Sequence, residues 1–482
     1  MVLKVFNTLG RRMEEFVPLR SGEVRIYVCG PTVYDYIHIG NARAFVVADV
    51  VRRYLEYKGF RVKYVSNITD IDDKMINRAK EMEISIQELG ELYSDAYFED
   101  IAKLNVKKPD VTPRVTQHIP EIIEAIETLV EKGYAYAVDG DVYFDVSKFE
   151  EYGKLSGNKA EALEMGARIE VNPKKKDPAD FALWKGWKSG EPGWHSPWGK
   201  GRPGWHIECS TIAQKYLGET LDIHMGGKDL IFPHHENEIA QAEAATGKTF
   251  VRYWLHNEWL TVEGEKMSKS LGNFITVRDA LKMCSPAVLR FFLLSAHYRS
   301  PLDFNKEALK TSERKVERLI RALKRLNDLP ERDSQTSEDK KLLFEVEERK
   351  KRFEESMDDD FNTSLAIFAL FSIVKSINNY ADANETIGRS VKQRVLKIFT
   401  DLLDVLGIEW SIDKQERGLT ELLEAVISIL IDVRDEMRRR KEWEIADSIR
   451  ERLKKIGVIL EDAHKETRWT IKSQCRTELE TS

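Results

Sequence analysis

The stretch Gly-Glu-Val-Arg-Ile-Tyr-Val-Cys-Gly at residues 22–30 decides the fold of this chain. Its side chains alternate between two faces, which is the period of a β-strand. A loop follows at residues 31–41, and apolar side chains then recur at helical spacing from Val47 until Gly59 ends the helix. A second strand at residues 61–68 completes a β-loop-α-β unit. We therefore predict an α/β fold with a Rossmann-like parallel sheet, whose ligand binds at the carboxyl ends of the strands.

Two short motifs lie far apart in the predicted catalytic region. The first is His-Ile-Gly-Asn at residues 38–41, directly before the helix, and the second is Lys-Met-Ser-Lys-Ser at residues 266–270. In this order, and with a parallel sheet at the first, they resemble the nucleotide-binding motifs of class I aminoacyl-tRNA synthetases. The first motif departs from that pattern at Asn41, where the family has histidine. This side chain can donate a hydrogen bond but never carries charge.

Composition argues against membrane-spanning, disulfide-rich and general nucleic-acid-binding proteins. The sequence has no apolar run long enough to cross a membrane and no basic-then-apolar leader, so we expect a cytoplasmic protein. Its four cysteines are scattered, which suits metal ligation better than a disulfide framework. The net charge of −6 argues against a general nucleic-acid binder but permits a basic surface on one domain. A charged fraction of 32% is a feature of thermophilic proteins.

Composition and periodicity divide the 482 residues into several segments. The catalytic domain is expected in two halves separated by a connective insertion rich in proline, glycine and tryptophan, and an α-helical bundle and a small C-terminal module follow. In chain order these segments are residues 1–110, 111–204, 205–310, 311–410 and 411–482.

Helical periodicity is strong from residue 311 onward. Leu319, Leu323 and Leu326 share one predicted helix face, and Leu365 and Phe368 share a face of the next helix. The terminal module carries basic and aromatic side chains with interleaved acids. These residues alone leave two interpretations open, a solvated helical face or a surface for single-stranded bases.

Four potential metal ligands come from separate segments. Cys29 and Cys209 are expected at the ends of two strands, and His234 and Glu238 lie four residues apart on one face of a helix that begins at Pro233. Two thiolates, an imidazole and a carboxylate suit tetrahedral zinc. The opposing interpretation is structural, because no Cys-x-x-Cys pair is present and a single cysteine at a strand end is usually a small core residue.

Several nearby polar residues receive structural roles. Asp70, Asp72 and Asp73 are expected to cap a helix over residues 75–105. His235 follows a predicted zinc ligand but should point about 100° away from it on a regular helix. We therefore expect His235 to support the site rather than to bind the ion.

The blocks around these ligands extend the resemblance to one family. Cys29 occurs in order with Gly-Trp-His-Ile-Glu-Cys at residues 204–209, Phe-Pro-His-His-Glu-Asn-Glu at residues 232–238 and the motif at residues 266–270. This set resembles the cysteinyl-tRNA synthetases over nearly the whole chain. The resemblance implies one zinc ion per chain, which binds the thiol of the substrate cysteine and is held by Cys29, Cys209, His234 and Glu238.

The resemblance also implies the reaction and its substrates. L-cysteine and ATP, with Mg²⁺, would give cysteinyl-adenylate, and the acyl group would pass to the terminal adenosine of tRNA(Cys) on a monomeric enzyme. The catalytic residues implied are His38, Asn41, Lys266 and Lys269. Contacts with ATP are expected from His38, Gly40, His224, Gly227, Asp229 and Lys269. Contacts with cysteine are expected from Cys29, Gly30, Tyr27, Thr69 and Trp205.

Two other functions stay open at this point. A cysteine ligase on the same scaffold could act on an amino sugar, although the predicted helices at residues 311–470 weigh against it. A non-catalytic RNA-binding protein could hold zinc for structural reasons, although the intact Lys266 and Lys269 weigh against that.

Overall fold

A computed structural model of the chain describes residues 2–157, 173–267, 272–410, 412–455, 458–462 and 467–471. For residues 412–425, 455, 459, 461–462 and 467–471 it describes the backbone alone. The chain divides into two units by its internal contacts, Met1–Trp410 and Ser411–Ser482. Lys269, which the sequence motif singles out, lies outside the described residues.

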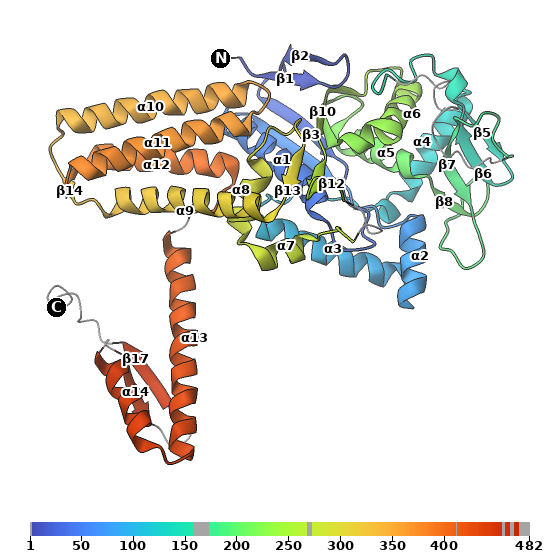
Figure 1. Ribbon diagram of the computed structural model, residues 1–482. Helices are drawn as coiled ribbons and strands as arrows, with labels where there is room; N and C mark the ends of the chain where they lie inside the picture. Colours follow the sequence, from blue (N-terminus) through green and yellow to red (C-terminus); the bar gives the residue numbers. More distant parts are fainter. Residues whose placement is uncertain are drawn as a thin grey trace. The chain divides into compact units, whose positions relative to one another are not determined.

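A four-stranded parallel sheet lies at the centre of the first unit (Figure 1). The strand order is β10-β9-β3-β4, and β3 pairs in parallel with β4 on one side and β9 on the other. The chain proceeds from β3 towards one edge of the sheet, to β4, and from β9 towards the other edge, to β10. In such sheets ligands bind at the carboxyl ends of the strands, between the two strands where this change occurs. The predicted α/β fold with a parallel sheet is confirmed. The strand bounds are β3 (Glu23–Val28), β4 (Arg61–Ser66), β9 (Leu221–Gly227) and β10 (Val251–Asn257).

Helix α1 (Ile39–Tyr57) connects β3 to β4 and begins with a capping box. The His38 side chain accepts a hydrogen bond from the Asn41 N–H at 3.2 Å, and the Asn41 side chain accepts one from the His38 N–H at 3.3 Å. These bonds satisfy donors that the start of a helix would otherwise leave open. The motif at residues 38–41 is thus fixed by its own backbone at the carboxyl end of β3.

The segment after β4 forms two helices where the sequence predicted one. Helix α2 spans Asp73–Met82 and α3 spans Ile86–Lys103. Glu83 adopts a left-handed conformation with φ of 55°, and Ser85 then caps α3. A left-handed residue cannot continue a right-handed helix, so the prediction of one helix over residues 75–105 was wrong.

The three aspartates before α2 have different roles. Asp72 caps α2 by accepting a hydrogen bond from the Met75 N–H at 2.8 Å, as predicted. Asp70 accepts from the Thr116 N–H at 3.0 Å, and Asp73 forms an ion pair with Lys185 at 2.6 Å. Asp70 and Asp73 therefore tie neighbouring segments together, and the capping role predicted for them was wrong.

A small antiparallel sheet with strand order β5-β6-β7-β8 follows α4 (Ile119–Glu131). Asp139 and Gly140, a residue pair typical of tight hairpin turns, both have positive φ, 47° and 83°, and join two paired strands. Trp184 is fully buried beside Trp198, so these aromatics anchor the sheet. The strands are β5 (Ala135–Val138), β6 (Asp141–Phe144), β7 (Phe181–Gly186) and β8 (Gly201–Pro203).

The remaining elements around the parallel sheet frame its carboxyl edge. Helices α5 and α6 pack on each other, and β11 pairs with both β12 and β13. A further hairpin, β1 (Lys4–Asn7) with β2 (Arg12–Glu15), contacts β10. The bounds of the others are α5 (Trp205–Leu217), α6 (Glu236–Thr246), β11 (Leu260–Val262), β12 (Glu265–Lys266), α7 (Val277–Met283), α8 (Pro286–Leu294) and β13 (Leu302–Phe304).

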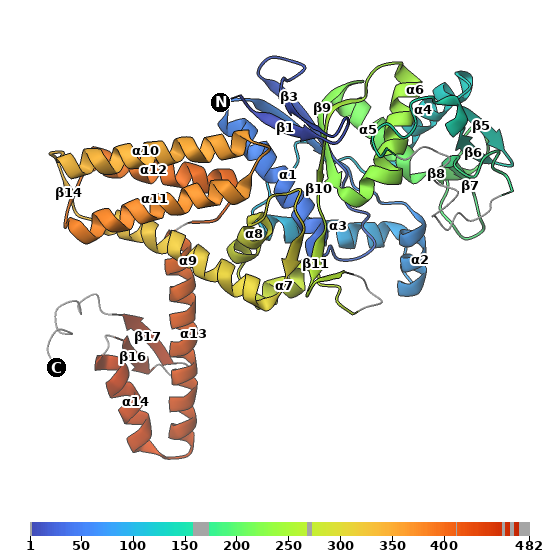
Figure 2. The same ribbon diagram turned by 45° about the horizontal axis from the view of Figure 1, so that its top comes forward.

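Four long helices form a bundle in which they run side by side (Figures 1 and 2). They are α9 (Lys306–Asp328), α10 (Ser337–Asp358), α11 (Thr363–Ala383) and α12 (Arg389–Leu406), with a short strand pair, β14 (Glu331–Arg332) and β15 (Ile387–Gly388), at one end. Leu319, Leu323 and Leu326 are all buried on α9. Leu365 and Phe368 share a face of α11, as predicted, and that face is exposed, at 51% and 70%.

Helix α11 has an unusually apolar composition. Among the described residues, α11 alone is long enough and apolar enough to cross a membrane. Half of its most apolar stretch is buried inside the structure. Its neighbours are α9, α10 and α12 of the bundle. The composition therefore matches that of a core helix.

The second unit has its own small core. Helix α13 (Ile412–Arg439) packs against α14 (Trp443–Lys455), and β16 (Val458–Asp462) pairs antiparallel with β17 (Thr467–Ile471). Ile427, Leu453, Val458 and Leu460 form its apolar cluster.

A buried polar cluster ties α12 to the parallel sheet region. Arg290 on α8 is fully buried and donates to the Asp49 carboxylate at 2.5 Å and to the Leu406 carbonyl at 2.7 Å. Asn105 donates to the Gly407 carbonyl at 2.8 Å. Gly407 ends α12 in the left-handed conformation, with φ of 61°, and a Cβ there would overlap the Arg290 guanidinium.

This arrangement predicts the effect of two glycine substitutions. Gly59→Ala places a Cβ at φ of 90° with nothing within 4 Å, so it should cost only the backbone strain of about 1–2 kcal/mol. Gly407→Ala should cost that amount plus a further ~1–3 kcal/mol, because the Arg290 side chain must shift. Urea and thermal unfolding of both variants measure the difference. Equal losses would mean that Arg290 is free to move.

Candidate active site

A cavity of about 410 Å³ lies at the carboxyl ends of β3 and β9, where the strand order reverses. The motif at residues 38–41 forms one side, and residues 257–260 after β10 form part of its lining. Most residues that the sequence assigned to ATP and cysteine meet here, although they come from separate segments. Those in the lining are Cys29, Gly30, His38, Gly40, Asn41, Trp205, Gly227, Asp229 and Lys266.

Three predicted contact residues lie behind the cavity wall. Tyr27 and His224 are fully buried, and Thr69 is nearly so. Their side chains are hydrogen-bonded to other buried groups, Tyr27 to Asn67 and His224 to Glu238. These three residues are not part of the cavity lining, and their contact with cysteine or ATP stays a prediction.

Asn67, at the end of β4, connects these buried groups to the cavity. Its Oδ1 accepts hydrogen bonds from the Gly30 N–H at 2.9 Å and from the Tyr27 hydroxyl at 3.1 Å. Its Nδ2 donates to the Thr69 hydroxyl at 3.1 Å, which in turn donates to Glu208 at 3.2 Å. Gly30 also approaches the Asn67 backbone so closely that a Cβ would overlap it. Sequence reasoning missed Asn67, although a polar residue at the end of a strand beside Thr69 was a usable signal.

The first motif is ordered by short-range contacts. His38 Nδ1 accepts the Asn41 N–H, so in the neutral ring the proton lies on Nε2. A Cβ on Gly40 would lie 2.8 Å from the His38 ring, which explains why glycine is needed here. Gly40 and Asn41 at the N-terminus of α1 line the cavity, and a helix N-terminus favours anionic groups.

A cluster of thiols, imidazoles and one carboxylate lies beside the cavity. Cys29 Sγ is 3.8 Å from Cys209 Sγ and 3.4 Å from Glu238 Oε1, and His234 Nε2 is 3.1 Å from the same oxygen. The ligand atoms of these four residues lie within 4.8 Å of one another. Cys209 comes from α5, so its predicted place at a strand end was wrong.

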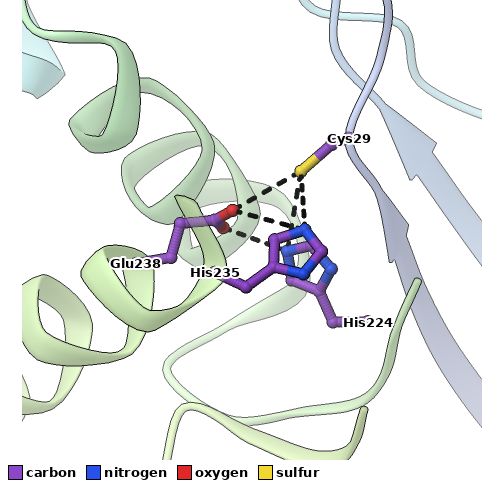
Figure 3. A group of neighbouring side chains, drawn as sticks. All are labelled: Cys29, His224, His235 and Glu238. Atoms are coloured by element: carbon purple, nitrogen blue, oxygen red, sulfur yellow. Dashed lines mark hydrogen bonds and ion pairs between the residues drawn. The ribbon is translucent and has the colours of Figure 1, made fainter. Parts of the chain in front are cut away.

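The same cluster contains a second group of four potential ligands (Figure 3). In it Cys29 and Glu238 are joined by His224 and His235, and His235 Nε2 is 3.5 Å from Cys29 Sγ. His235 was expected to support the site, and its ring reaches the same thiol as the ligands of the first group. Phe232 has extended backbone angles, so helical backbone begins at Pro233, as predicted, and continues into α6.

The donor atoms favour the first group as the metal-binding one. His224 Nε2 is hydrogen-bonded to Glu238 at 3.0 Å, and His235 Nδ1 is hydrogen-bonded to His256 at 2.8 Å. His234 Nε2 lies 3.1 Å from Glu238 Oε1 without hydrogen-bond geometry, and its Nδ1 is bonded to His206 at 2.8 Å, the outer contact that a metal-ligating histidine makes. The feature that distinguishes the first group is its second thiol. Two sulfurs bound tetrahedrally at about 2.3 Å from one ion lie about 3.8 Å apart, which matches the separation of the two thiols. The residues present therefore fit a metal ion.

The charges of the cluster are strongly coupled. Burial would raise the pKa of Glu238, but His224 and His234 beside it hold this pKa at about 2. The hydrogen bond from Cys29 lowers the pKa of Cys209 to about 6, whereas burial raises the pKa of Cys29 well above its usual value. Glu238 and Cys209 raise the pKa of His234 to about 10 against the effect of burial, so its imidazolium balances part of the negative charge. A metal ion binds thiolate rather than thiol, so its binding would release the Cys29 proton.

Comparisons with known proteins identify the family of the chain. A family model described as the class I (C) tRNA synthetase catalytic domain matches residues 15–314, and a DALR domain matches residues 352–410. The chain is 52% identical over 470 residues to a cysteine–tRNA ligase of Anoxybacillus flavithermus, which covers 97% of this chain and 99% of that protein. It is 50% identical over 473 residues to a cysteine–tRNA ligase of Thermococcus onnurineus, with the same coverage.

Solved structures support the fold. Mycobacterium tuberculosis methionyl-tRNA synthetase, in complex with methionyl-adenylate, superposes with a TM-score of 0.59 at 16% identity, covering 80% of this chain and 89% of that one. Thermus thermophilus arginyl-tRNA synthetase superposes with a TM-score of 0.53 at 15% identity, covering 83% and 84%.

The two ligand groups differ in the number of thiolates, which gives a direct test. If Cys209 binds the metal, Cys209→Ser should lower the thiolate-to-metal absorption of the cobalt-substituted protein by roughly half, because one of two sulfur ligands is lost. Cys284→Ser is the matched control, since Cys284 lies outside both groups and should leave the spectrum unchanged. An unchanged spectrum in the Cys209 variant would assign the metal to the group with His224 and His235.

Proposed function

The chain belongs to the cysteine–tRNA ligases, a family of class I aminoacyl-tRNA synthetases, and on that premise we propose that it activates L-cysteine with ATP and transfers the cysteinyl group to the terminal adenosine of tRNA(Cys). The observation that carries the proposal is the position of Cys29. This residue lines the nucleotide cavity and belongs to the metal-ligand cluster as well. A cysteine bound with its carboxylate towards the first motif would therefore have its thiol near the cluster.

We assign one zinc ion to Cys29, Cys209, His234 and Glu238. When bound, it would supply a soft Lewis acid that takes a thiol in preference to a hydroxyl. The Trp205 ring stacks on the His234 ring with centroids 4.2 Å apart and also lines the cavity. Trp205 would thus hold the His234 ring in place and form one wall around the cysteine side chain. Gly30 would leave room for the substrate backbone, because Asn67 fixes its position.

In the first step an oxygen of the cysteine carboxylate attacks the α-phosphorus of ATP, and pyrophosphate leaves. Chemistry of this type depends mostly on positioning and on neutralising charge. His38 and the N-terminus of α1 would bind the phosphates, and Asn41 would act chiefly by orienting His38 through the capping box. Lys266 and Lys269 would neutralise the leaving pyrophosphate, with Mg²⁺ on the nucleotide. Gly40, Gly227 and Asp229 would contact the nucleoside.

In the second step a hydroxyl of the terminal ribose attacks the carbonyl carbon of the adenylate, and AMP leaves. We propose that the bundle and the Ser411–Ser482 unit bind the tRNA, since Trp443 is 55% exposed at the start of α14 and exposed aromatic rings stack on bases. We also propose a cytoplasmic monomer, because one chain supplies both the motif and the cluster. The amino-sugar ligase and the non-catalytic protein lose support, since the relatives match 97% of this chain.

Exchange of pyrophosphate into ATP tests the proposed activity. The purified chain should catalyse this exchange with L-cysteine and not with L-serine at the same concentration, because apolar contacts separate such isosteres by only about 10²-fold while a soft metal ion separates them further. The cobalt-substituted protein should change its absorption spectrum with cysteine and keep it with serine. Exchange that serine supports equally well would contradict the assignment of the metal to substrate selection.

Removal of the second unit separates the two steps. A chain ending at Trp410 keeps every described cavity residue, so cysteine-dependent exchange should stay within about twofold of the full chain. Charging of tRNA(Cys) should fall by ~10²-fold or more, because base stacking contributes about 1–3 kcal/mol per base. Normal charging by the shortened chain would show that the unit has another task.

A further inference from the structure

Arg43 on α1 is fully buried and lies two residues after the first motif. Its Nη1 donates to the carbonyls of Glu258 and Trp259, both at 2.9 Å. Its Nη2 donates to the carbonyls of His297 at 3.2 Å and Ser300 at 2.6 Å. One guanidinium therefore holds α1 to two other segments, the junction of β10 with β11 and the junction of α8 with β13.

The charge of Arg43 makes this contact costly. All four hydrogen bonds go to carbonyl oxygens, and the nearby Glu258 carboxylate is paired with Lys228 at 2.7 Å instead. Burial lowers the pKa of Arg43 to about 10. The Glu258 carboxylate offsets part of that effect without bonding Arg43 directly. A buried cation that bonds only carbonyl oxygens is a poor source of stability, and only the planar fork of arginine can reach four acceptors at once. The burial of Arg43 is better explained by the spacing that it fixes between α1 and the two segments whose carbonyls it bonds.

The two held segments also bond to each other. The Glu258 N–H donates to the Tyr298 carbonyl at 2.8 Å, and the Leu302 N–H donates to the Trp259 carbonyl at 3.2 Å. Residues 257–260 line the cavity together with His38, Gly40 and Ala44 of the α1 side. Arg43 therefore sits where the spacing between these two parts of the lining is determined.

The Trp259 ring extends this effect to the second motif. Lys266 Nζ lies 5.2 Å from its centroid and Lys228 Nζ 5.4 Å from it, which are cation–π distances. Trp259 is 46% exposed and lines the cavity. The position of the Trp259 backbone thus sets where the first lysine of the second motif rests.

We propose that Arg43 is a positioning residue for ATP: it holds the Glu258–Trp259 wall at a fixed distance from the first motif and thereby places Lys266. This inference rests on the proposed function and goes beyond it, because Arg43 touches neither the cavity nor the metal-ligand cluster. Its loss should weaken the use of ATP without affecting the cysteine side of the cavity, where Cys29, Gly30 and Trp205 lie.

The test compares two buried arginines in the full chain. Arg43→Lys keeps the charge but cannot reach all four carbonyls, so the KM for ATP in cysteine-dependent exchange should rise by ~10-fold or more, since small displacements of a positioning group are costly. The KM for cysteine and the bound metal should stay within about twofold. Arg290→Lys is the matched control, because Arg290 is equally buried and also bonds carbonyls but lies away from the cavity. It should lower thermal stability while leaving the KM for ATP within about twofold.

Three results would overturn the inference: an unchanged KM for ATP in Arg43→Lys, an equal rise in the KM for ATP and for cysteine, or the same rise in Arg290→Lys. Arg43→Gln provides a second variant that carries no buried charge and so avoids that cost to folding; it should show the same selective rise. Absence of cysteine-dependent exchange in the unaltered chain would contradict the proposed function instead, so the two failures are distinguishable.

Discussion

The parallel pairing of β3 with β9 is the interaction on which the site depends. Ile26, Tyr27 and Val28 are aligned with Ile223, His224 and Met225 across this pair. The pairing joins two parts of the chain that are almost 200 residues apart and places Cys29, just beyond β3, beside the elements that follow β9. Without this register the thiol of Cys29 would not meet Glu238, and the first motif would not face Gly227.

The buried charges around that junction are arranged so that each has partners. Glu236 at the start of α6 accepts hydrogen bonds from the N–H groups of Gly153 at 3.0 Å and Ser156 at 2.7 Å. Glu238, two residues later in the same helix, faces the thiols and imidazoles. An unpaired buried carboxylate is costly. The hydrogen bonds of Glu236 therefore hold the start of α6 in place, and the contacts of Glu238 hold its carboxylate oxygens at the cluster. The position of the cluster and the attachment of the segment at residues 149–157 are therefore linked.

Sequence patterns predicted the features that depend on local spacing. Alternation and helical periodicity were sufficient for β3, α1 and β4, and the turn at Asp139 and Gly140 follows from its residue types. They failed where backbone conformation departs from a regular element. Glu83 breaks a helix without glycine or proline, and His235 lies within reach of Cys29 although it was not expected to reach a ligand of the cluster. Buried contacts such as that of Asn67 depend on tertiary packing, which no local pattern encodes.

The candidate ligands illustrate how far a residue set can be predicted without its geometry. The resemblance named four residues whose donor atoms do lie together, yet the structure brings His224 and His235 to the same carboxylate, so residue type alone could not choose between the groups. The choice follows from the second thiol, since the 3.8 Å between the sulfurs of Cys29 and Cys209 matches two sulfur ligands of one ion. Selection between cysteine and serine would then depend on one atom of the substrate and a few donor atoms of the protein. The shape of the pocket needs only to bring that atom to the cluster, which is why small residues such as Gly30 and a rigid ring such as Trp205 suffice around it.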